Sequence, residues 1–370
     1  QSFNFYPVAS MTTHDGFAVA AVGLGQYVLD GERAFRFSPS YPALDIVSIN
    51  DIMRYSQTEF YAVNLAQSEI DLLLGENAGL VKLDISRSES DGTLTHSASV
   101  YSLDNDTLNP GLGSPGPRVV NFANILKYDY IPLAHTLKTV LEVVREAFGA
   151  PVEIEYAVDL TKDEEGKATF YLLQIKPLVG SGAGYSIDPE SVYTDETLLV
   201  SRKSMGNGLV EGITDIIYVE PETFDNLKTN EMAAEIDAIN RQMLAEGRKY
   251  VLIGPGRWGT KDRFLGIPVE WPQISNARII VEVSMPNFHI DASQGSHFFH
   301  NVTSMRIGYL AVNEATAEGV IMWDRLREMP EVGKGTWFRH VRFPNPLVIR
   351  MDGKIGMAVI SEGDSAAAAT

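Results

Sequence analysis

Two short segments of the chain, residues 152–158 and 170–177, alternate apolar and polar side chains with a period of two. This period is typical of β-strands that bury one face. The polar residues 161–166 between them, Thr-Lys-Asp-Glu-Glu-Gly, end in a glycine and are typical of a turn. The pattern therefore predicts a β-hairpin.

The same alternation predicts which side chains of the hairpin share a face. Glu153 and Glu155 lie on one face of the first strand, and Gln174 and Lys176 share a face of the second. Carboxylate and amide oxygens suit Mg²⁺, and a cation suits a phosphate, so the polar face suits a metal-bound nucleoside triphosphate. The best carboxylate is Glu155. Glu153 stays an alternative, because the long connection leaves the cross-strand register open.

The pattern before the hairpin predicts short strands and one helix. Residues 1–110 are expected to form mainly strands and turns, with strands at 16–22 and 79–85. Residues 132–148 change to a helical period, and Gly149 follows as the C-cap. The apolar stripe of this helix consists of Leu133, Leu137, Val140, Leu141, Val144 and Phe148.

After residue 195 the pattern predicts alternating strands and helices. Strands are expected at 215–219, 250–253 and 277–283, and a helix at 229–246, with Thr229 as its N-cap and Gly247 just beyond its end. This half of the chain is therefore expected to be α/β.

Composition and charge narrow the class of protein. Hydrophobic residues make up 45% of the 370 residues, enough for packed cores in two or three domains. The net charge of −18 disfavours nucleic acid and anionic membrane surfaces as partners. The absence of cysteine excludes disulfides and thiolate catalysis, and it fits a cytoplasmic protein. The sequence contains no run of about 18 apolar residues, so it predicts no membrane-spanning helix. The sequence begins at Gln1 rather than at a methionine, and we expect it to be part of a longer chain.

The hairpin also carries a family resemblance. Ile154-Glu-Tyr156, followed by Leu173-Gln-Ile-Lys-Pro177, resembles the end of the ATP-grasp domain in the phosphoenolpyruvate synthase and pyruvate phosphate dikinase family, whose second strand usually reads Leu-Gln-x-Arg-Pro. Upstream, Val22-Gly-Leu-Gly-Gln-Tyr-Val-Leu-Asp-Gly31 resembles the family's Gly-Leu-Gly-Glu-x-Val-x-Gly segment. The resemblance covers residues from about 5 to 180. It departs from the family at Lys176, which replaces an arginine, and at Gln26, which replaces a glutamate.

This resemblance implies a cofactor and its ligands. ATP would bind with Mg²⁺, and the metal would lie at Glu155 and Gln174. Gln174 and Lys176 would contact the nucleotide, and Lys176 would neutralise charge on the transferring phosphoryl group. Gly23 and Gly25 would approach the phosphates, or alternatively would serve packing beneath the site.

A second segment, Gly295-Ser-His-Phe-Phe299, loosely resembles the Gly-Gly-x-x-Ser-His-Ala-Ala motif of the swivelling phosphohistidine domain in the same enzymes. Phe298, Val302 and Met305 follow a helical spacing, which predicts a helix near His297 with Ser296 as its N-cap. His297 is therefore a candidate phosphoryl acceptor. Phe298 and Phe299 replace the motif's two small residues, and a structural role for the histidines stays open.

Two further patterns have alternative interpretations. His297 and His300, with His289 and Asp291 before them, could instead hold a metal ion in a hydrolase. Residues 254–259, Gly-Pro-Gly-Arg-Trp-Gly, could form an anion-binding loop through Arg257 or a turn that buries Trp258.

Together these observations predict a mixed α+β and α/β protein. Residues 1–180 would form the C-terminal part of an ATP-grasp-like domain, 181–195 a linker, 196–360 an α/β domain of phosphohistidine type, and 361–370 a disordered tail. The expected function is ATP-dependent phosphotransfer to a small, pyruvate-like acceptor, with the other ATP-grasp lobe and the acceptor domain elsewhere in a longer chain. The alternatives are a non-catalytic binding or regulatory protein, favoured by Lys176, Gln26 and the missing lobe, and the histidine-centred hydrolase.

Overall fold

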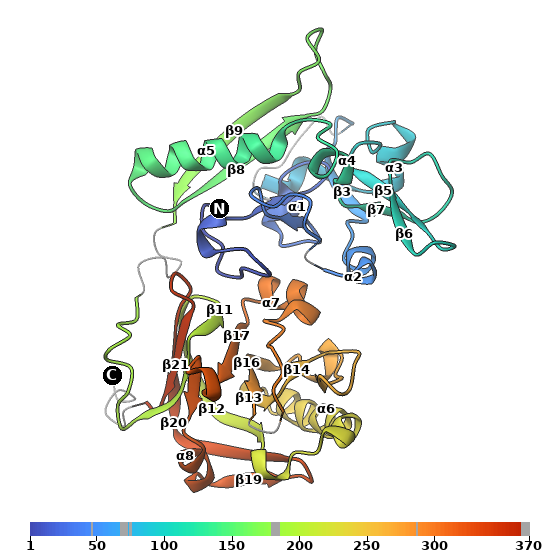
Figure 1. The fold of residues 1–370 in the computed structure, drawn as a ribbon. Coiled ribbons are helices and arrows are strands. Elements are labelled where there is room, and N and C mark those ends of the chain that lie inside the picture. The colour runs from blue at the N-terminus through green and yellow to red at the C-terminus, as the bar shows by residue number, and fades with distance from the viewer. Residues whose placement is uncertain (46, 67–72, 74–75, 179–185, 286–287, 364–370) are drawn as a thin grey trace. The chain divides into compact units, whose positions relative to one another are not determined.

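A computed structural model describes residues 1–45, 47–66, 73, 76–178, 186–285 and 288–363 of the chain (Figure 1). The chain divides into two compact units. The first consists of residues 1–4 and 14–178, and the second of residues 5–13 and 179–370. The predicted linker lies partly, and the predicted tail mostly, outside the described residues.

The first unit is built from small antiparallel sheets around one apolar core. Its two-stranded sheets pair β1 with β2, β3 with β4 and β8 with β9, and a three-stranded sheet has β5 between β6 and β7. The strands are β1 (Ala18–Ala20), β2 (Phe35–Phe37), β3 (Glu59–Val63), β4 (Leu80–Asp84), β5 (Ala98–Ser102), β6 (Thr107–Pro110), β7 (Arg118–Val120), β8 (Val152–Asp159) and β9 (Thr169–Pro177). The helices are α1 (Gln26–Leu29), α2 (Ile49–Arg54), α3 (Ile85–Ser90), α4 (Ala123–Leu126) and α5 (Leu133–Phe148), with 3-10 turns η1 (Thr13–Asp15) and η3 (Glu76–Gly79).

Helix α5 supports the β8–β9 hairpin, and the two run alongside each other in Figure 1. The predicted helix is confirmed, including Gly149, whose φ of 62° ends the helix in the left-handed conformation. Leu137 and Leu141 are buried in the same core as Val152 of β8. Phe148 is 51% exposed, so the buried stripe ends one turn earlier than expected. The apolar face of the hairpin is thus fixed on the helix.

The second unit contains one large mixed sheet. Its strands lie in the order β11-β17-β16-β13-β12-β20-β21-β10-β18. The additional strand β19 pairs with the first residues of β20. The pairs β12–β13, β13–β16 and β16–β17 are parallel, and the other pairs are antiparallel. The chain is therefore a mixed α/β protein, as the sequence predicts at this level.

The sheet strands are β10 (Thr197–Ser201), β11 (Lys203–Met205), β12 (Gly208–Val219), β13 (Tyr250–Pro255), β16 (Ala277–Ser284), β17 (Gly308–Asn313), β18 (Gly319–Ile321), β19 (Glu331–Lys334), β20 (Phe338–Asp352) and β21 (Met357–Ser361). A small parallel pair is formed by β14 (Arg257–Trp258) and β15 (Gly266–Ile267). The helices are α6 (Thr229–Ala245), α7 (Phe299–Ser304) and α8 (Trp323–Glu328). The 3-10 turns are η4 (Pro221–Thr223), η5 (Asn226–Lys228), η6 (Trp271–Gln273), η7 (Ser296–Phe298) and η8 (Glu314–Thr316).

Helix α6 connects the parallel strands β12 and β13, which is the connection that parallel strands require. The predicted N-cap is wrong: Lys228 occupies the N-cap position, and Thr229 is the first helical residue. The hydroxyl of Thr229 is directed instead to the carbonyl oxygen of Arg263, at 3.0 Å. Gly247 follows the helix with a φ of 65°, as the sequence predicts.

Candidate functional site

The β8–β9 hairpin brings the predicted polar residues onto one face. Glu155 pairs directly with Gln174 across the two strands, and Glu153 pairs with Lys176. Directly opposed side chains in an antiparallel pair have Cβ atoms about 5 Å apart, so the carboxylate and the amide lie within reach of one common ligand. The structure thus fixes the register that the sequence left open.

Two of the polar side chains form an ion pair. The Nζ of Lys176 lies 2.6 Å from the Oε1 of Glu155, and both side chains are about half exposed. Glu153 has a different partner, because its carboxylate accepts a hydrogen bond from the side-chain amide of Gln1. Glu155 is therefore the carboxylate that lies beside both Gln174 and Lys176. Glu153 is instead hydrogen-bonded to Gln1.

The ion pair keeps Lys176 charged. The hydrogen bond to Glu155 raises the pKa of Lys176, so the amine stays charged at neutral pH. An exposed ion pair contributes little to folding, typically about 0–1 kcal/mol. It can therefore open to admit a metal or a phosphate at low cost.

The opposite face of the hairpin is apolar and anchored. The ring of Tyr156 stacks on that of Phe170 with centroids 5.5 Å apart, and the hydroxyl of Tyr156 donates to the carbonyl oxygen of Val19 at 3.2 Å. A bulge follows Glu155: the next residue, Tyr156, pairs with Leu172, and Leu173 is passed over. Leu173 is 63% exposed and does not join the apolar face as the alternation predicts. Bulges re-aim neighbouring side chains, and this one lies next to the Glu155–Gln174 pair.

The glycine segment has a packing role at one of its two glycines. A Cβ at Gly23 would lie 2.9 Å from both the Cβ of Phe60 and the carbonyl oxygen of Tyr61, and its φ is 92°. Only glycine fits this close approach to β3. Gly25 lies at the N-cap of α1, and no described atom comes within 4 Å of its Cβ position. A phosphate contact at either glycine stays a prediction.

The histidine segment differs locally from its predicted form. The 3-10 turn η7 precedes α7, and Gly295, in the left-handed conformation at φ 73°, occupies the N-cap of that turn. Ser296 is therefore the first residue of the turn, and its expected capping role is wrong. No side chain in the described part of the chain caps either start.

His297 lies on the outside of this turn. It is exposed, whereas the neighbouring Phe298 and Phe299 are buried and anchor the turn. His300 is partly buried. Among the residues that the structure describes, no three His, Asp or Glu side chains lie close enough together to hold a metal ion, so the geometry gives His297 and His300 no third ligand. A role for His297 as phosphoryl acceptor stays a prediction.

A buried carboxylate that the sequence analysis missed lies in β16. Glu282 is 2% exposed and accepts hydrogen bonds from the backbone N–H groups of Trp258 and Ser293 and from the hydroxyl of Tyr309, at 3.1, 2.6 and 2.9 Å. Burial raises the pKa of Glu282, and these hydrogen bonds oppose that effect. Glu282 thereby fixes strand β14 and the segment before η7 to the carboxyl end of a parallel strand, the edge where ligands bind in many α/β proteins.

Residues 254–259 comprise the end of β13 and strand β14 rather than a loop. Trp258 is fully buried, and its indole N–H donates to the carbonyl oxygen of Val281 at 3.0 Å, so the buried-tryptophan interpretation is confirmed. The Nε of Arg257 donates to the carbonyl oxygen of Asp291 at 2.7 Å. A single glutamate within the apolar run 279–283 was the available signal for the missed site.

A second missed carboxylate, Asp215, lies in β12 and is 1% exposed. His340, Arg342 and Arg248 approach its two oxygens at 2.7, 2.8 and 2.5 Å. Burial raises the pKa of Asp215, but the hydrogen bonds from His340, Arg248 and Arg342 outweigh burial and hold the pKa well below its usual value. The aspartate therefore stays ionised inside the fold.

No protein-family model, no curated protein and no solved structure matches the chain. None of the helices in the described part of the chain is both long enough and apolar enough to cross a bilayer.

Proposed function

We propose that the polar face of β8–β9 is the metal and nucleotide half of an ATP-dependent phosphotransferase site. The observation that carries this proposal is the register, which places Glu155 directly opposite Gln174 with Lys176 2.6 Å from the carboxylate. Mg²⁺ in nucleotide sites is usually held by one or two carboxylates together with phosphate oxygens. One carboxylate, one amide oxygen and one cation on an exposed face fit that chemistry.

Each residue has a separate role in this proposal. Glu155 and the amide oxygen of Gln174 would bind Mg²⁺, which in turn holds the phosphates. Lys176 would leave Glu155 when the metal arrives and would then neutralise charge on the transferring phosphoryl group. Phosphoryl transfer depends mainly on such positioning and charge stabilisation, so these three groups suffice for one wall of the site.

The resemblance to phosphoenolpyruvate synthase and pyruvate phosphate dikinase supports this proposal and extends it. Those enzymes pass the phosphoryl group through a histidine to a pyruvate-like acceptor, and His297 is the candidate carrier here. A ring nitrogen of His297 would form a P–N bond as the P–O bond to the nucleotide breaks, and the ring proton would pass to solvent. An acceptor domain and a second ATP-grasp lobe in a longer chain belong to the same proposal.

Calorimetry of the full-length protein with ATP, with and without Mg²⁺, tests the metal site. Glu155→Gln should weaken Mg²⁺-dependent ATP binding about tenfold, because a neutral amide is a poorer ligand for a hard cation. Glu165→Gln is the matched control. Glu165 also forms an ion pair with a lysine of this hairpin, Lys167, at 2.5 Å, but this pair lies in the turn and not on the polar face of the strands. Equal ATP affinity with and without Mg²⁺, or equal losses in both variants, would contradict the proposal.

A further inference from the structure

The sheet of the second unit contains a pocket whose cause is a mismatch in strand length. Strand β12 has 12 residues, but β13 pairs with it only from Asp215 onward. In the described part of the sheet, the first half of β12 therefore lacks a neighbour on that side. Two register shifts, on either side of Ile213, bend this half further, and Gly212 adopts a φ of 81°. The resulting gap is a pocket of about 530 Å³.

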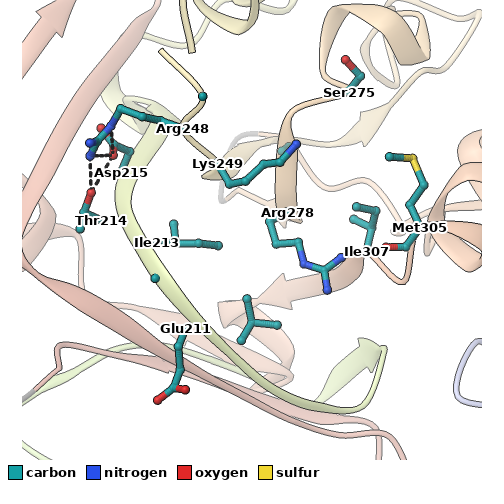
Figure 2. Close-up of a pocket in the computed structure, with 14 residues that line it drawn as sticks. Glu211, Ile213, Thr214, Asp215, Arg248, Lys249, Ser275, Arg278, Met305 and Ile307 are labelled. Carbon is teal, nitrogen blue, oxygen red and sulfur yellow. Dashed lines mark hydrogen bonds and ion pairs between the residues drawn. The ribbon is translucent and has the colours of Figure 1, made fainter. Parts of the chain in front are cut away.

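The size of this pocket fits a small molecule, since ligand sites usually measure about 300–1,000 Å³. Its walls come from β12, from the segment before β13, from the start of β16 and from the segment before β17 (Figure 2). Apolar side chains line part of it, namely Val210, Ile213, Ala277, Met305 and Ile307.

Three cations line the pocket: Arg248, Lys249 and Arg278. Arg248 is neutralised, because its guanidinium binds the carboxylate of Asp215 at 2.5 Å (Figure 2). The other two cations have neutral partners. Lys249 donates to the amide oxygen of Asn276 at 2.5 Å, and Arg278 donates to the carbonyl oxygen of Met305 at 2.8 Å.

Neither Lys249 nor Arg278 has a carboxylate within ion-pair distance among the residues that the structure describes, a feature that they share with other cations of the chain. The pocket has one other acid, Glu211, and Figure 2 shows its carboxylate directed away from both cations. Two uncompensated cations over apolar walls suit a ligand with an anionic group and an apolar body.

We propose that this pocket binds a small organic anion, a phosphate ester or a carboxylate, through Lys249 and Arg278. Arg278 offers a planar fork that can hold two oxygens of one anion, and Lys249 adds a mobile point charge. The apolar side chains Ile213 and Ile307 cover the body of the ligand. This site belongs to the second unit and is independent of the proposed hairpin site.

The test measures binding of pyrophosphate, citrate and glucose 6-phosphate by calorimetry at low ionic strength, with EDTA present so that no metal takes part. The full-length protein should bind at least one probe, and the phosphate and carboxylate probes distinguish the two ligand chemistries. Lys249→Gln with Arg278→Gln should weaken that binding at least tenfold. Lys249→Arg with Arg278→Lys keeps both charges and should retain most of it.

A second double variant, Lys261→Gln with Arg263→Gln, serves as the control. This variant also removes one lysine and one arginine charge, but from an exposed segment of the second unit that does not line the pocket. It should bind the probes like the wild type. The proposal is overturned if the wild type binds none of the three probes. It is equally overturned if the Lys249 and Arg278 double variant binds as the wild type does, or if the control variant loses as much binding.

Discussion

The Nζ of Lys176 lies 2.6 Å from the Oε1 of Glu155, although Lys176 stands directly opposite Glu153 in the register. The lysine therefore reaches diagonally across the hairpin. Glu153 binds the side chain of Gln1 instead, which leaves Glu155 to the lysine. The result is that cation, carboxylate and the amide of Gln174 gather at one place on an exposed face.

The first prediction concerns the charge of Lys176. If the hairpin is the proposed phosphotransferase site, Lys176→Met in the full-length protein should lower the rate of phosphoryl transfer from ATP about tenfold or more, because the cation proposed to neutralise developing charge is lost. Lys176→Arg should retain most of the rate, since the family that the hairpin resembles has an arginine there. Lys167→Met, in the loop of the same hairpin, is the control. An unchanged rate in Lys176→Met would remove this residue from the site.

The second prediction concerns His297 as a phosphoryl carrier. Incubating the full-length protein with ATP labelled on the transferred phosphoryl group should give an adduct that is labile in acid and stable in base, as a phosphohistidine is. His297→Ala should abolish the adduct. His300→Ala, three residues further along the chain, should leave it intact. An adduct that survives in His297→Ala would assign the carrier to another residue.

The sequence predicts local elements well where one face is buried. The hairpin, α5 and α6 all appear at the expected positions, because their apolar residues follow the period of a strand or a helix. The bulge at Leu173 coincides with a break in the alternation, where Leu172 and Leu173 follow one another, but this break alone does not say which residue the partner strand passes over. The cross-strand register depends on the geometry of the connecting turn as well as on the apolar pattern, and the long connection leaves it open in the sequence.

The missed carboxylates show a different limit. Asp215 and Glu282 each stand as a single charge beside an apolar run, which marks them as unusual but does not name their partners. The partner His340 lies 125 positions from Asp215 in the sequence, and Tyr309 lies 27 positions from Glu282. Such contacts follow from the order of strands in the sheet, and strand order is a property of the whole fold.

The third prediction follows from the ion pairs of Asp215. Its pKa is held below the usual value of 3.8, so its contribution to stability is present above that pH and is lost as the pH falls through the folded-state pKa. Asp215→Asn should destabilise the protein at pH 7 by about 3 kcal/mol, because Arg248 and Arg342 lose their shared carboxylate. Urea denaturation between pH 2 and pH 7 should show a weaker loss of stability in acid for the variant. Equal acid sensitivity in both proteins would contradict this assignment.

The fourth prediction concerns Glu282, whose effect on stability changes with pH in the opposite direction to that of Asp215. Burial raises the pKa of Glu282 above the usual carboxyl pKa of 4.5. The folded protein therefore loses stability as the pH rises from 4.5 toward the pKa that Glu282 has in the folded state. Glu282→Gln should remove that pH dependence. The substitution should also lower the free energy of unfolding by about 1–3 kcal/mol, because the amide NH₂ of the glutamine would face backbone N–H donors that now donate to a carboxylate oxygen. Thermal unfolding at several pH values measures both effects, and a variant with wild-type pH dependence would refute the role of Glu282.

In the proposed site, metal and nucleotide meet at Gln174 and Glu155. Mn²⁺ substitutes for Mg²⁺ and broadens the nuclear magnetic resonance signals of nearby groups, so a titration with Mn²⁺ and ATP locates the metal directly. We expect the side-chain amide signal of Gln174 to broaden first, ATP to strengthen the effect, and Glu155→Gln to weaken it. Broadening that starts at His297 and His300, or that leaves Gln174 unchanged at saturating ATP, would rule out the hairpin as the metal site.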